Sequence, residues 1–296
     1  MSQPKNVLVT AATGKTGVHT TRLLLERGHH VRALVHRLDE RSAHLADLGA
    51  EVAVGDLLDL ASVTSATRGI DTAYFAYPIV PGLVDATAVF AEATADSGVR
   101  AIVNMSQISA RRDAVSDAAR QHWIAERVLD WSPVPTTHLR PTFFAEWLIT
   151  FLDDRGVLRL PFADGRHAPI AAEDQAHVIA AILEDPEPHA GEVYLLRGPV
   201  ELNHTEIAAE LSGALGRPLS YEPISLDEFT ATLEARGFGA HTVQHLRSVA
   251  VDYRNGIFAG TDDVVATVGG KVPMTVAEYA VRNEEFFEDK GSWAFW

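Results

Sequence analysis

The chain has 296 residues, of which 47% are hydrophobic, enough for one large domain or two moderate ones around a packed core. Its 40 acidic residues outnumber 25 basic ones and give a net charge of −15, which disfavours nucleic acid and anionic membranes as partners. The absence of cysteine excludes disulfides, thiolate catalysis and cysteine-based metal centres. No apolar run reaches the roughly 20 residues of a membrane helix, and the first predicted strand leaves no room for a signal peptide, so we expect a cytoplasmic protein.

The first half of the chain alternates short apolar runs with helical stretches, which is typical of a parallel sheet wrapped by helices. The predicted strands are 6–10, 30–36, 51–55, 72–76, 101–106 and 136–140. The predicted helices are 17–27, 41–48, 60–66, 83–97 and 116–131. This order predicts an α/β fold, a Rossmann-type doubly wound parallel sheet with its ligand at the carboxyl ends of the strands.

Beyond Arg140, segments rich in Pro, Gly and Asp alternate with predicted helices 173–184 and 205–215. We predict a nucleotide-binding domain over 1–155, to which 169–198 returns through a strand at 192–196. A smaller, mostly helical lobe over 156–296 is expected to cover the substrate. The tail predicts one amphipathic helix over 275–289 with a solvated acidic end, and an aromatic stretch from Trp293 to Trp296 for a groove or a partner.

The first predicted strand runs into the small-residue turn Ala11-x-x-Gly14-x-x-Gly17, and a helix follows. Small residues let the backbone approach a pyrophosphate, and the helix N-terminus supplies free N–H groups and a positive dipole. A P-loop would need glycine five residues before Gly14, where Val9 stands. The pattern therefore predicts dinucleotide binding. The expected contacts are Thr10, Ala12, Thr13, Gly14, Lys15 and Thr16.

The end of the second predicted strand indicates which dinucleotide is bound. An NAD site places an acidic residue there, whereas this chain has Arg37, and Asp39 lies beyond the strand. Arg37 either pairs with the 2′-phosphate of NADP(H) or is a solvated loop residue, and we favour NADP(H). After the third strand, Asp56 and Leu57 border the adenine, although Asp56 is equally suited to cap a helix.

Several motifs together resemble the NmrA-like atypical short-chain dehydrogenase/reductases, a family that includes quinone-oxidoreductase-like members. They are the 10–17 turn, the Arg37 strand end, Gly55-Asp56-Leu57, His122-x-x-x-Glu126 and the segments 139–144, 195–199 and 208–218. The resemblance implies a Rossmann-type fold, an NADP(H) site and a cleft under a C-terminal lobe. Ala11 replaces the family's usual glycine, which costs little if its φ is negative.

Ordinary short-chain reductases carry a Tyr-x-x-x-Lys pair on the helix after the fifth strand, where this chain places Ala118 and His122. Without the tyrosine, His122 is the candidate general acid, with an ordinary pKa of about 6.5, or else it binds the nicotinamide ribose. Glu126 either orients His122 or caps backbone groups. Ser106 either hydrogen-bonds the acceptor's oxygen or caps the next element.

The remaining predicted site residues follow the fourth, fifth and sixth strands. Ala76, Tyr77, Thr142 and Phe143 are expected at the cofactor, and Gln107, Phe144 and Trp147 at the substrate. Phe143 and Trp147 are spaced to share one helical face, which belongs either to the core or to the pocket. The histidines show no metal-ligand spacing, so we expect no metal site.

These observations predict an NADPH-dependent oxidoreductase that transfers hydride to a small conjugated acceptor such as a quinone or an enone. A site without a strong acid suits such acceptors, because the reduced quinone is aromatic. Two alternatives remain: a non-catalytic NADP(H)-sensing regulator, and a reductase or isomerase of a secondary-metabolite intermediate. We expect a small-molecule acceptor as ligand and a monomer or homodimer.

Overall fold

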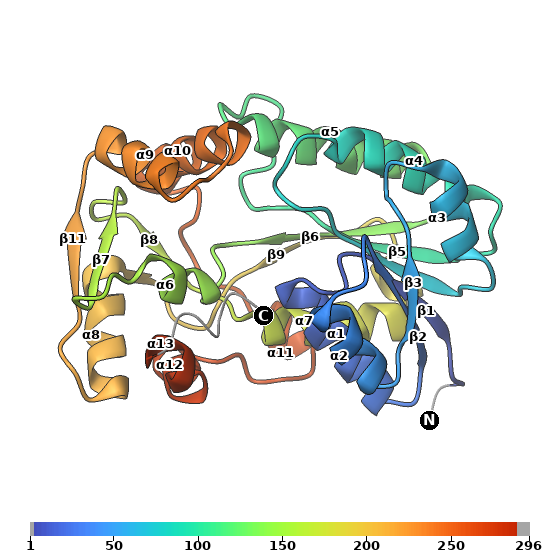
Figure 1. Ribbon diagram of the computed structural model, residues 1–296, viewed down its shortest axis with the longest axis horizontal. Coiled ribbons are helices and arrows are strands. Elements are labelled where there is room, and N and C mark those ends of the chain that lie inside the picture. The colour runs from blue at the N-terminus through green and yellow to red at the C-terminus, as the bar shows by residue number, and fades with distance from the viewer. Residues whose placement is uncertain (1–2, 289–296) are drawn as a thin grey trace.

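The computed structural model describes residues 3–288, which form a parallel sheet with helices on both faces and a second lobe beside it (Figure 1). The aromatic stretch from Trp293 to Trp296 lies outside the described residues. Within residues 3–288, no helix combines the length and apolarity needed to cross a membrane.

The central sheet has seven strands, and every pairing in it is parallel. In spatial order they are β3 (Glu51–Val54), β2 (His30–Val35), β1 (Asn6–Val9), β4 (Thr72–Phe75), β5 (Ala101–Met105), β6 (Thr136–Pro141) and β9 (Val193–Leu196). The strand order reverses between β1 and β4, which is where a doubly wound sheet opens a crevice for its ligand. The predicted Rossmann-type fold is confirmed.

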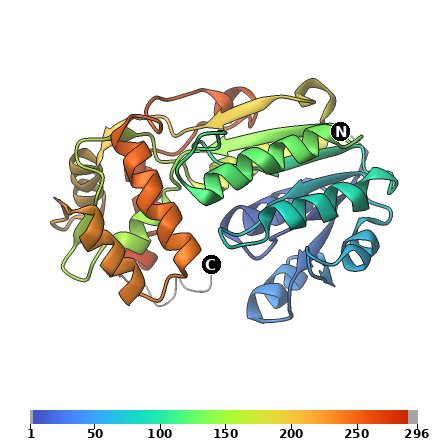
Figure 2. The same cartoon turned by 90° about the horizontal axis from the view of Figure 1, so that it is seen from above.

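Two layers of helices cover the two faces of this sheet (Figures 1 and 2). One face is covered by α1 (Lys15–Glu26), α2 (Glu40–Asp47), α7 (Ala172–Glu184) and α11 (Val264–Thr267). The other face is covered by α3 (Leu60–Thr67), α4 (Leu83–Ala95) and α5 (Asp117–Trp131).

Strand β1 shows why the strands are apolar without alternation. Val7 and Val9 pack with α1 and α7, whereas Leu8 between them packs with α3 and α4. Successive side chains point to opposite faces, and all three are at most 1% exposed because helices cover both faces.

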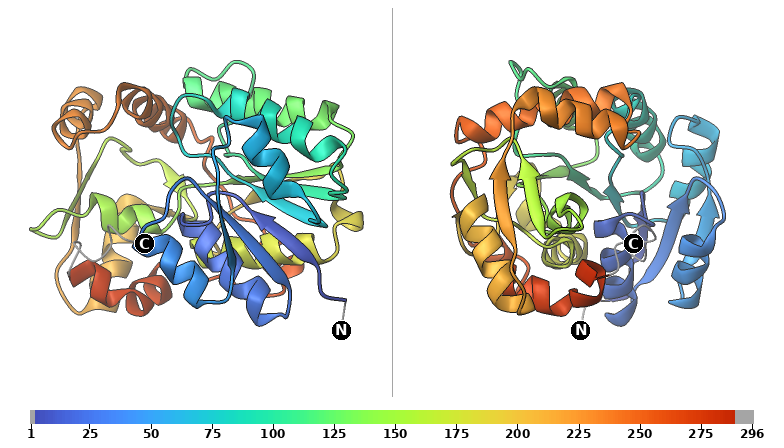
Figure 3. Two further views of the ribbon diagram at one scale, coloured as in Figure 1. Left: turned by 45° about the vertical axis from the view of Figure 1, so that its right-hand side comes forward. Right: turned by 60° about the vertical axis from the view of Figure 1, so that its left-hand side comes forward.

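The second lobe contains helices and two small sheets (Figure 3). Its helices are α6 (Glu146–Phe151), α8 (His204–Leu215), α9 (Leu226–Ala235), α10 (Ala240–Arg254), α12 (Val276–Arg282) and α13 (Glu284–Glu288), and a short 3₁₀ turn, Glu187–His189, precedes β9. The lobe has apolar clusters of its own, around Ile207 and Tyr279 and around Phe229 and Tyr253. The division of the chain at residue 155 stays a prediction.

The sequence pattern does not predict the four short strands of this lobe. Strand β7 (Val157–Leu160) pairs in parallel with β11 (Ser220–Pro223), and β8 (Arg166–His167) pairs antiparallel with β10 (Leu202–Asn203). Each strand has at most four residues and a partner far away in sequence. Local periodicity over so few residues carries no signal of such pairing.

The tail forms two helices, not the one predicted over 275–289. Helix α12 follows the N-cap Thr275, whose side chain accepts a hydrogen bond from the Glu278 N–H, and it ends at Asn283 before α13 begins. Glu284, Glu285 and Glu288 are exposed, as a solvated acidic face requires, and Asp289 lies outside the described residues.

The turn between β1 and α1 places Ala11 at a φ of +46°, so the condition under which alanine would cost little there is not met. The turn is closed by the Gly14 N–H, which donates to the Ala11 carbonyl over 2.8 Å. Gly17 is required there, because a Cβ on it would lie 2.4 Å from the Ala11 oxygen. An alanine in the left-handed region costs about 1–2 kcal/mol, which glycine avoids.

Replacing Ala11 with glycine is therefore expected to raise the free energy of unfolding by about 1 kcal/mol, since relief of strain exceeds the added chain entropy. Denaturation with urea measures the change. The neighbouring Ala12, which is fully buried and lacks a positive φ, is the control, and Ala12→Gly should destabilise the protein. A loss of stability in Ala11→Gly would contradict the assignment of strain.

Candidate active site

A cavity of about 890 Å³ lies at the carboxyl ends of the parallel strands, between the sheet and the second lobe. Loops following β1, β2, β3, β4, β5 and β6 all contribute to its walls, and α10 closes it from the other lobe. This is the edge at which a doubly wound sheet binds its ligand.

The loop after β1 brings the N-terminus of α1 to the cavity. Gly14 is the N-cap of α1, with no side chain capping the helix and no acidic residue in its first turn. Ala11, Thr13, Gly14, Lys15 and Thr16 line the cavity. The N-terminus of a helix without a side-chain cap, beside a lysine, suits the pyrophosphate of a dinucleotide.

Thr10 and Ala12 do not line the cavity, contrary to the prediction. The Thr10 side chain donates to the Ala76 carbonyl and accepts from the Ala76 N–H, so it ties β1 to β4. Ala12 is fully buried in the core beneath the loop. Both residues lie in the core beside the 11–17 turn and do not reach the cavity.

Arg37 also lies outside the residues that line the cavity. Its side chain is 75% exposed, and its Nε is 3.7 Å from Asp39. Arg41, on α2, lines the cavity instead, with its guanidinium 3.0 Å from Asp39. The predicted basic residue after β2 is therefore better matched by Arg41 than by Arg37, because Arg41, in the first turn of α2, lines the cavity.

Asp56 and Leu57 line the cavity after β3, and Ala76 and Tyr77 do so after β4. Asp56 does not cap α3, whose N-cap is Asp59. The Asp56 Oδ1 instead accepts a hydrogen bond of 2.9 Å from the Leu58 N–H, which closes a local turn.

His122 lines the cavity from α5 and is only 5% exposed. Burial, with a smaller contribution from His245, lowers its pKa to about 3, so the expected pKa of about 6.5 is wrong. The imidazole is therefore neutral near pH 7 and carries no extra proton to transfer to an acceptor.

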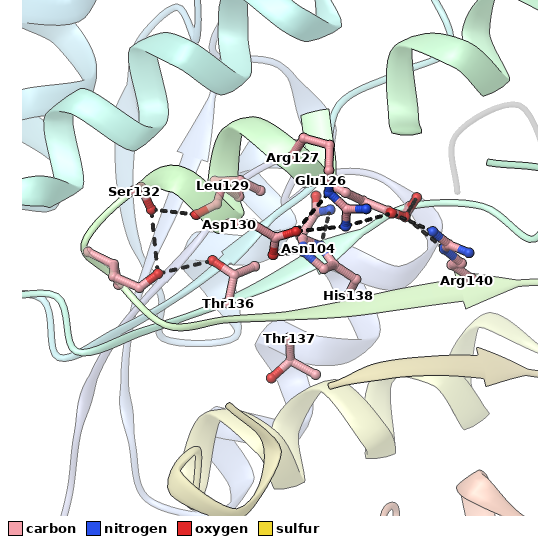
Figure 4. Close-up of polar contacts among 12 residues, drawn as sticks. Asn104, Glu126, Arg127, Leu129, Asp130, Ser132, Thr136, Thr137, His138 and Arg140 are labelled. Atoms are coloured by element: carbon pink, nitrogen blue, oxygen red, sulfur yellow. Dashed lines mark hydrogen bonds and ion pairs between the residues drawn. The ribbon is translucent and has the colours of Figure 1, made fainter. Parts of the chain in front are cut away.

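The carboxylate of Glu126 is bound to Ser106 and Arg140, and no hydrogen bond joins it to His122 among the described residues. Figure 4 shows Glu126 beside Arg140. The Ser106 hydroxyl donates to Glu126 Oε1 over 2.6 Å, and the Arg140 guanidinium donates to both carboxylate oxygens over 2.8 and 2.5 Å. The Ser106 proton is thus committed to Glu126. Neither predicted role of Ser106, donation to an acceptor or capping of the next element, describes this arrangement.

Phe143 and Trp147 do not share a helical face, because α6 begins only at Glu146. The Phe143 ring stacks on Phe258 with centroids 4.9 Å apart, and the Trp147 ring stacks on Phe151 at 5.3 Å. Phe143, Phe144 and Trp147 nevertheless all line the cavity, so the aromatic residues serve both core and pocket.

Three buried polar atoms at the cavity have no hydrogen-bond partner among the described residues: Gln107 Nε2, Thr142 Oγ1 and Glu146 Oε2. Buried polar groups ordinarily have partners, so their position at one cavity indicates that a ligand or water completes them. Within residues 3–288, no group of three or more His, Cys, Asp or Glu side chains is arranged to hold a metal ion.

Glu146, which the sequence analysis missed, is the carboxyl group of the cavity with the most strongly shifted pKa. Burial raises its pKa to about 7, although the Ala172 N–H donates to its Oε1 over 3.0 Å and Lys15 lies close enough to favour the charged form. Burial also lowers the pKa of Lys15 to about 8. These two groups therefore change charge near neutral pH, where His122 does not.

The raised pKa of Glu146 predicts a pH-dependent stability. The folded chain holds this proton more tightly than the unfolded chain, so stability is expected to fall as the pH rises from about 4.5 through 7. Glu146→Gln should match the wild type at about pH 4 and exceed it by up to about 3 kcal/mol at pH 8. Thermal unfolding across this range measures the effect, with exposed Glu26→Gln as control, and equal stability of Glu146→Gln and wild type at pH 8 would contradict it.

The second lobe contributes residues that the sequence analysis also missed. His245, Leu246 and Val249 of α10 and the nearby Phe258 line the cavity. They lie far along the chain from β6, and no local motif links them to the nucleotide site. The sequence did hold a signal for Glu146, because this residue stands between Phe144 and Trp147, which were both predicted at the substrate.

This Rossmann-type sheet, with its uncapped helix N-terminus at a cavity under a second lobe, has the architecture of a dinucleotide-binding α/β protein. The model of the NmrA-like family matches residues 3–280, and the chain belongs to that family. The resemblance drawn from the motifs is confirmed.

Individual relatives match along nearly the whole chain. An NAD(P)H azoreductase of Xenophilus azovorans is 29% identical over 279 residues, which cover 93% of this chain and 96% of the relative. A (4-alkanoyl-5-oxo-2,5-dihydrofuran-3-yl)methyl phosphate reductase of Streptomyces griseus is 29% identical, with coverages of 95% and 99%. The crystal structure of an NADPH-dependent quinone oxidoreductase of Escherichia coli superimposes with a TM-score of 0.79 at 25% identity, with coverages of 93% and 98%.

Proposed function

We propose that this protein is an NADPH-dependent oxidoreductase that transfers hydride to a small conjugated acceptor such as a quinone or an enone. The observation that carries the proposal is a single cavity that joins the phosphate-binding turn to an aromatic end at Phe143 and Phe258. The reductases that match along nearly the whole chain, one of them an NAD(P)H azoreductase, support the same class of reaction.

The residues present fit the dinucleotide. The N-terminus of α1, which has no side-chain cap, faces the cavity, and Lys15 and Arg41 supply positive charge there. Thr142 Oγ1 and Gln107 Nε2, which have no hydrogen-bond partner among the described residues, can bind polar groups of the dinucleotide. When bound, the nicotinamide supplies a hydride. The protein's own residues bind and orient the acceptor: aromatic side chains flank the flat ring, and the neutral His122 offers a hydrogen bond without a charge.

The missing Tyr-x-x-x-Lys pair is consistent with this choice of acceptor. Ala118, at the tyrosine position, is 2% exposed on α5, and His122 occupies the lysine position. A quinone takes one hydride and one proton and becomes an aromatic hydroquinone. Because aromatisation favours hydride acceptance, the proton can come from water without a strong protein acid.

A screen of NADPH oxidation with a quinone, an enone and an azo dye tests the proposal directly. We expect turnover with at least one of these conjugated acceptors and faster oxidation of NADPH than of NADH. Tight NADPH binding without oxidation by any of them would overturn the proposal and favour the NADP(H)-sensing regulator. We also propose a monomer or homodimer without a nucleic-acid partner, which the net charge of −15 supports.

The position of Arg41 predicts where NADP(H) selectivity resides. A charge-assisted pair with the 2′-phosphate contributes about 1.5–3 kcal/mol, and the lower end applies because the Arg41 side chain is 40% exposed. Arg41→Ala is therefore expected to weaken NADPH binding about tenfold and to leave NADH binding unchanged. Fluorescence titrations with both cofactors measure this. Arg37→Ala is the matched control. A larger loss of NADPH affinity in that variant would show that Arg37, and not Arg41, binds the 2′-phosphate.

A further inference from the structure

His245 brings a second imidazole to the cavity, from the opposite lobe to His122. Helix α10 packs against α5, and in Figures 1 and 2 the two helices adjoin above the edge of the sheet. Both histidines line the cavity and are 5% exposed. The substrate end of the cavity is therefore bounded by one histidine from each lobe.

Ser116 determines which nitrogen of His245 carries the proton. Its side chain is fully buried at the N-cap of α5, where Oγ accepts a hydrogen bond from the Ala119 N–H. Oγ is also 2.8 Å from His245 Nδ1. If Nδ1 were the donor, the Ser116 hydroxyl proton would be buried without an acceptor among the described residues. Ser116 therefore donates to Nδ1, and the proton of the neutral imidazole lies on Nε2.

This arrangement leaves Nε2–H for a ligand. The Nδ1 edge of the ring is held by Ser116, and within residues 3–288 no group is hydrogen-bonded to Nε2. Burial, together with the nearby His241, lowers the pKa of His245 to about 4, so the ring stays neutral near pH 7. Leu246, Val249 and Phe258 form the apolar wall around it.

We infer that His245 binds the substrate, with its Nε2–H donating to a carbonyl oxygen of a neutral conjugated acceptor and holding that acceptor under the second lobe. The inference rests on the proposed function and adds the acceptor's chemistry to it. A neutral donor within an apolar wall recognises an uncharged carbonyl, whereas a carboxylate would lose its hydration without gaining a positive partner. The substrate class is therefore an uncharged quinone or enone.

Two variants of His245 separate the role of Nδ1, which contacts Ser116, from the role of Nε2, which faces the ligand. Asparagine places its amide where Nδ1 lies, which preserves the contact with Ser116 and removes the donor at the cavity. Glutamine places its amide nitrogen near Nε2 and keeps a donor there. His241→Asn is the matched control, because His241 lies one turn earlier on α10 and does not line the cavity.

The probe is tetramethyl-1,4-benzoquinone, whose fully substituted ring does not add to side chains. Two quantities are measured: kcat/KM with NADPH, and the dissociation constant of this quinone for protein saturated with NADP⁺. We expect His245→Asn to lower kcat/KM and weaken quinone binding about fivefold to tenfold, with NADPH affinity unchanged. His245→Gln should recover most of the loss, and His241→Asn should behave as the wild type.

Binding to the NADP⁺ complex distinguishes the possible failures. Quinone affinity and kcat/KM unchanged in His245→Asn would overturn the inference while the proposed function stands. Quinone binding that depends on His245 without any NADPH oxidation would overturn the function and support the binding role. A wild type that binds no quinone at all would overturn the inference as well.

Discussion

Replacing Gly14 with valine is expected to abolish NADPH binding while the protein stays folded. Gly14 lines the cavity at the N-cap of α1, with φ −83° and ψ 171°, a conformation that any residue adopts. A Cβ there would meet only the Ala11 carbonyl, at 3.1 Å, which needs a shift of a few tenths of an ångström. The valine methyl groups would fill the space that the pyrophosphate requires, so affinity should fall at least about 100-fold.

Circular dichroism and an NADPH fluorescence titration on the same sample measure the effect of Gly14→Val. Gly213→Val is the matched control, because a Cβ at this exposed glycine of α8 meets no atom within 4 Å. Gly17→Ala should behave differently and impair folding, since its Cβ would lie 2.4 Å from the Ala11 oxygen. Normal NADPH affinity in Gly14→Val would show that the turn only connects β1 to α1.

Replacing Glu126 with alanine is expected to give the largest loss of stability. The carboxylate is fully buried and accepts one hydrogen bond from Ser106 and two from Arg140. Its removal therefore takes the partner away from the Ser106 hydroxyl and from the Arg140 guanidinium, which Figure 4 shows beside Glu126. Breaking a buried ion pair from one side costs about 3–5 kcal/mol. The lower end applies because the Arg140 side chain is 21% exposed and water can reach it.

Thermal and urea unfolding measure this loss, and a decrease of roughly 6–12 °C in Tm corresponds to about 3 kcal/mol. Glu26→Ala is the matched control, because Glu26 is 62% exposed and lies 3.9 Å from Arg22, a pair that contributes little. A Glu126→Ala protein as stable as the control would show that the Glu126–Arg140 pair adds no net stability. Because Ser106 lines the cavity, the variant should also change acceptor binding.

The nucleotide-binding half of the fold could be predicted from the sequence because its signals are local. Most strands covered on both faces are rich in apolar residues without strict alternation, and the intervening helices carry an apolar face. Each element is therefore evident within its own ten to fifteen residues. The 11–17 turn follows the first strand directly, and of the residues predicted there Thr13, Gly14, Lys15 and Thr16 line the cavity. The short strands β7, β8, β10 and β11 had no such signal.

The roles of the polar site residues depended on the tertiary structure. Arg37 and Arg41 are both basic residues that follow the second strand within a few positions of each other. Only Arg41, in the first turn of α2, lines the cavity. Glu126 lies four residues from His122, yet its carboxylate is bound to Ser106 and Arg140, which arrive from β5 and β6. Helical spacing identifies neighbours on one element, whereas hydrogen bonding selects among all the elements that converge on a site.

Composition, periodicity and the glycine turn by themselves determined that this chain is a dinucleotide-binding α/β protein, and its motifs identified the family. Only the tertiary structure decided the chemistry of the cavity, because burial shifts the pKa of a side chain according to what surrounds it. Burial leaves His122 neutral and brings the pKa of Glu146 to about 7. His245 reaches the cavity beside His122 only because α10 packs against α5. Its part of the chain carries no local motif for this site.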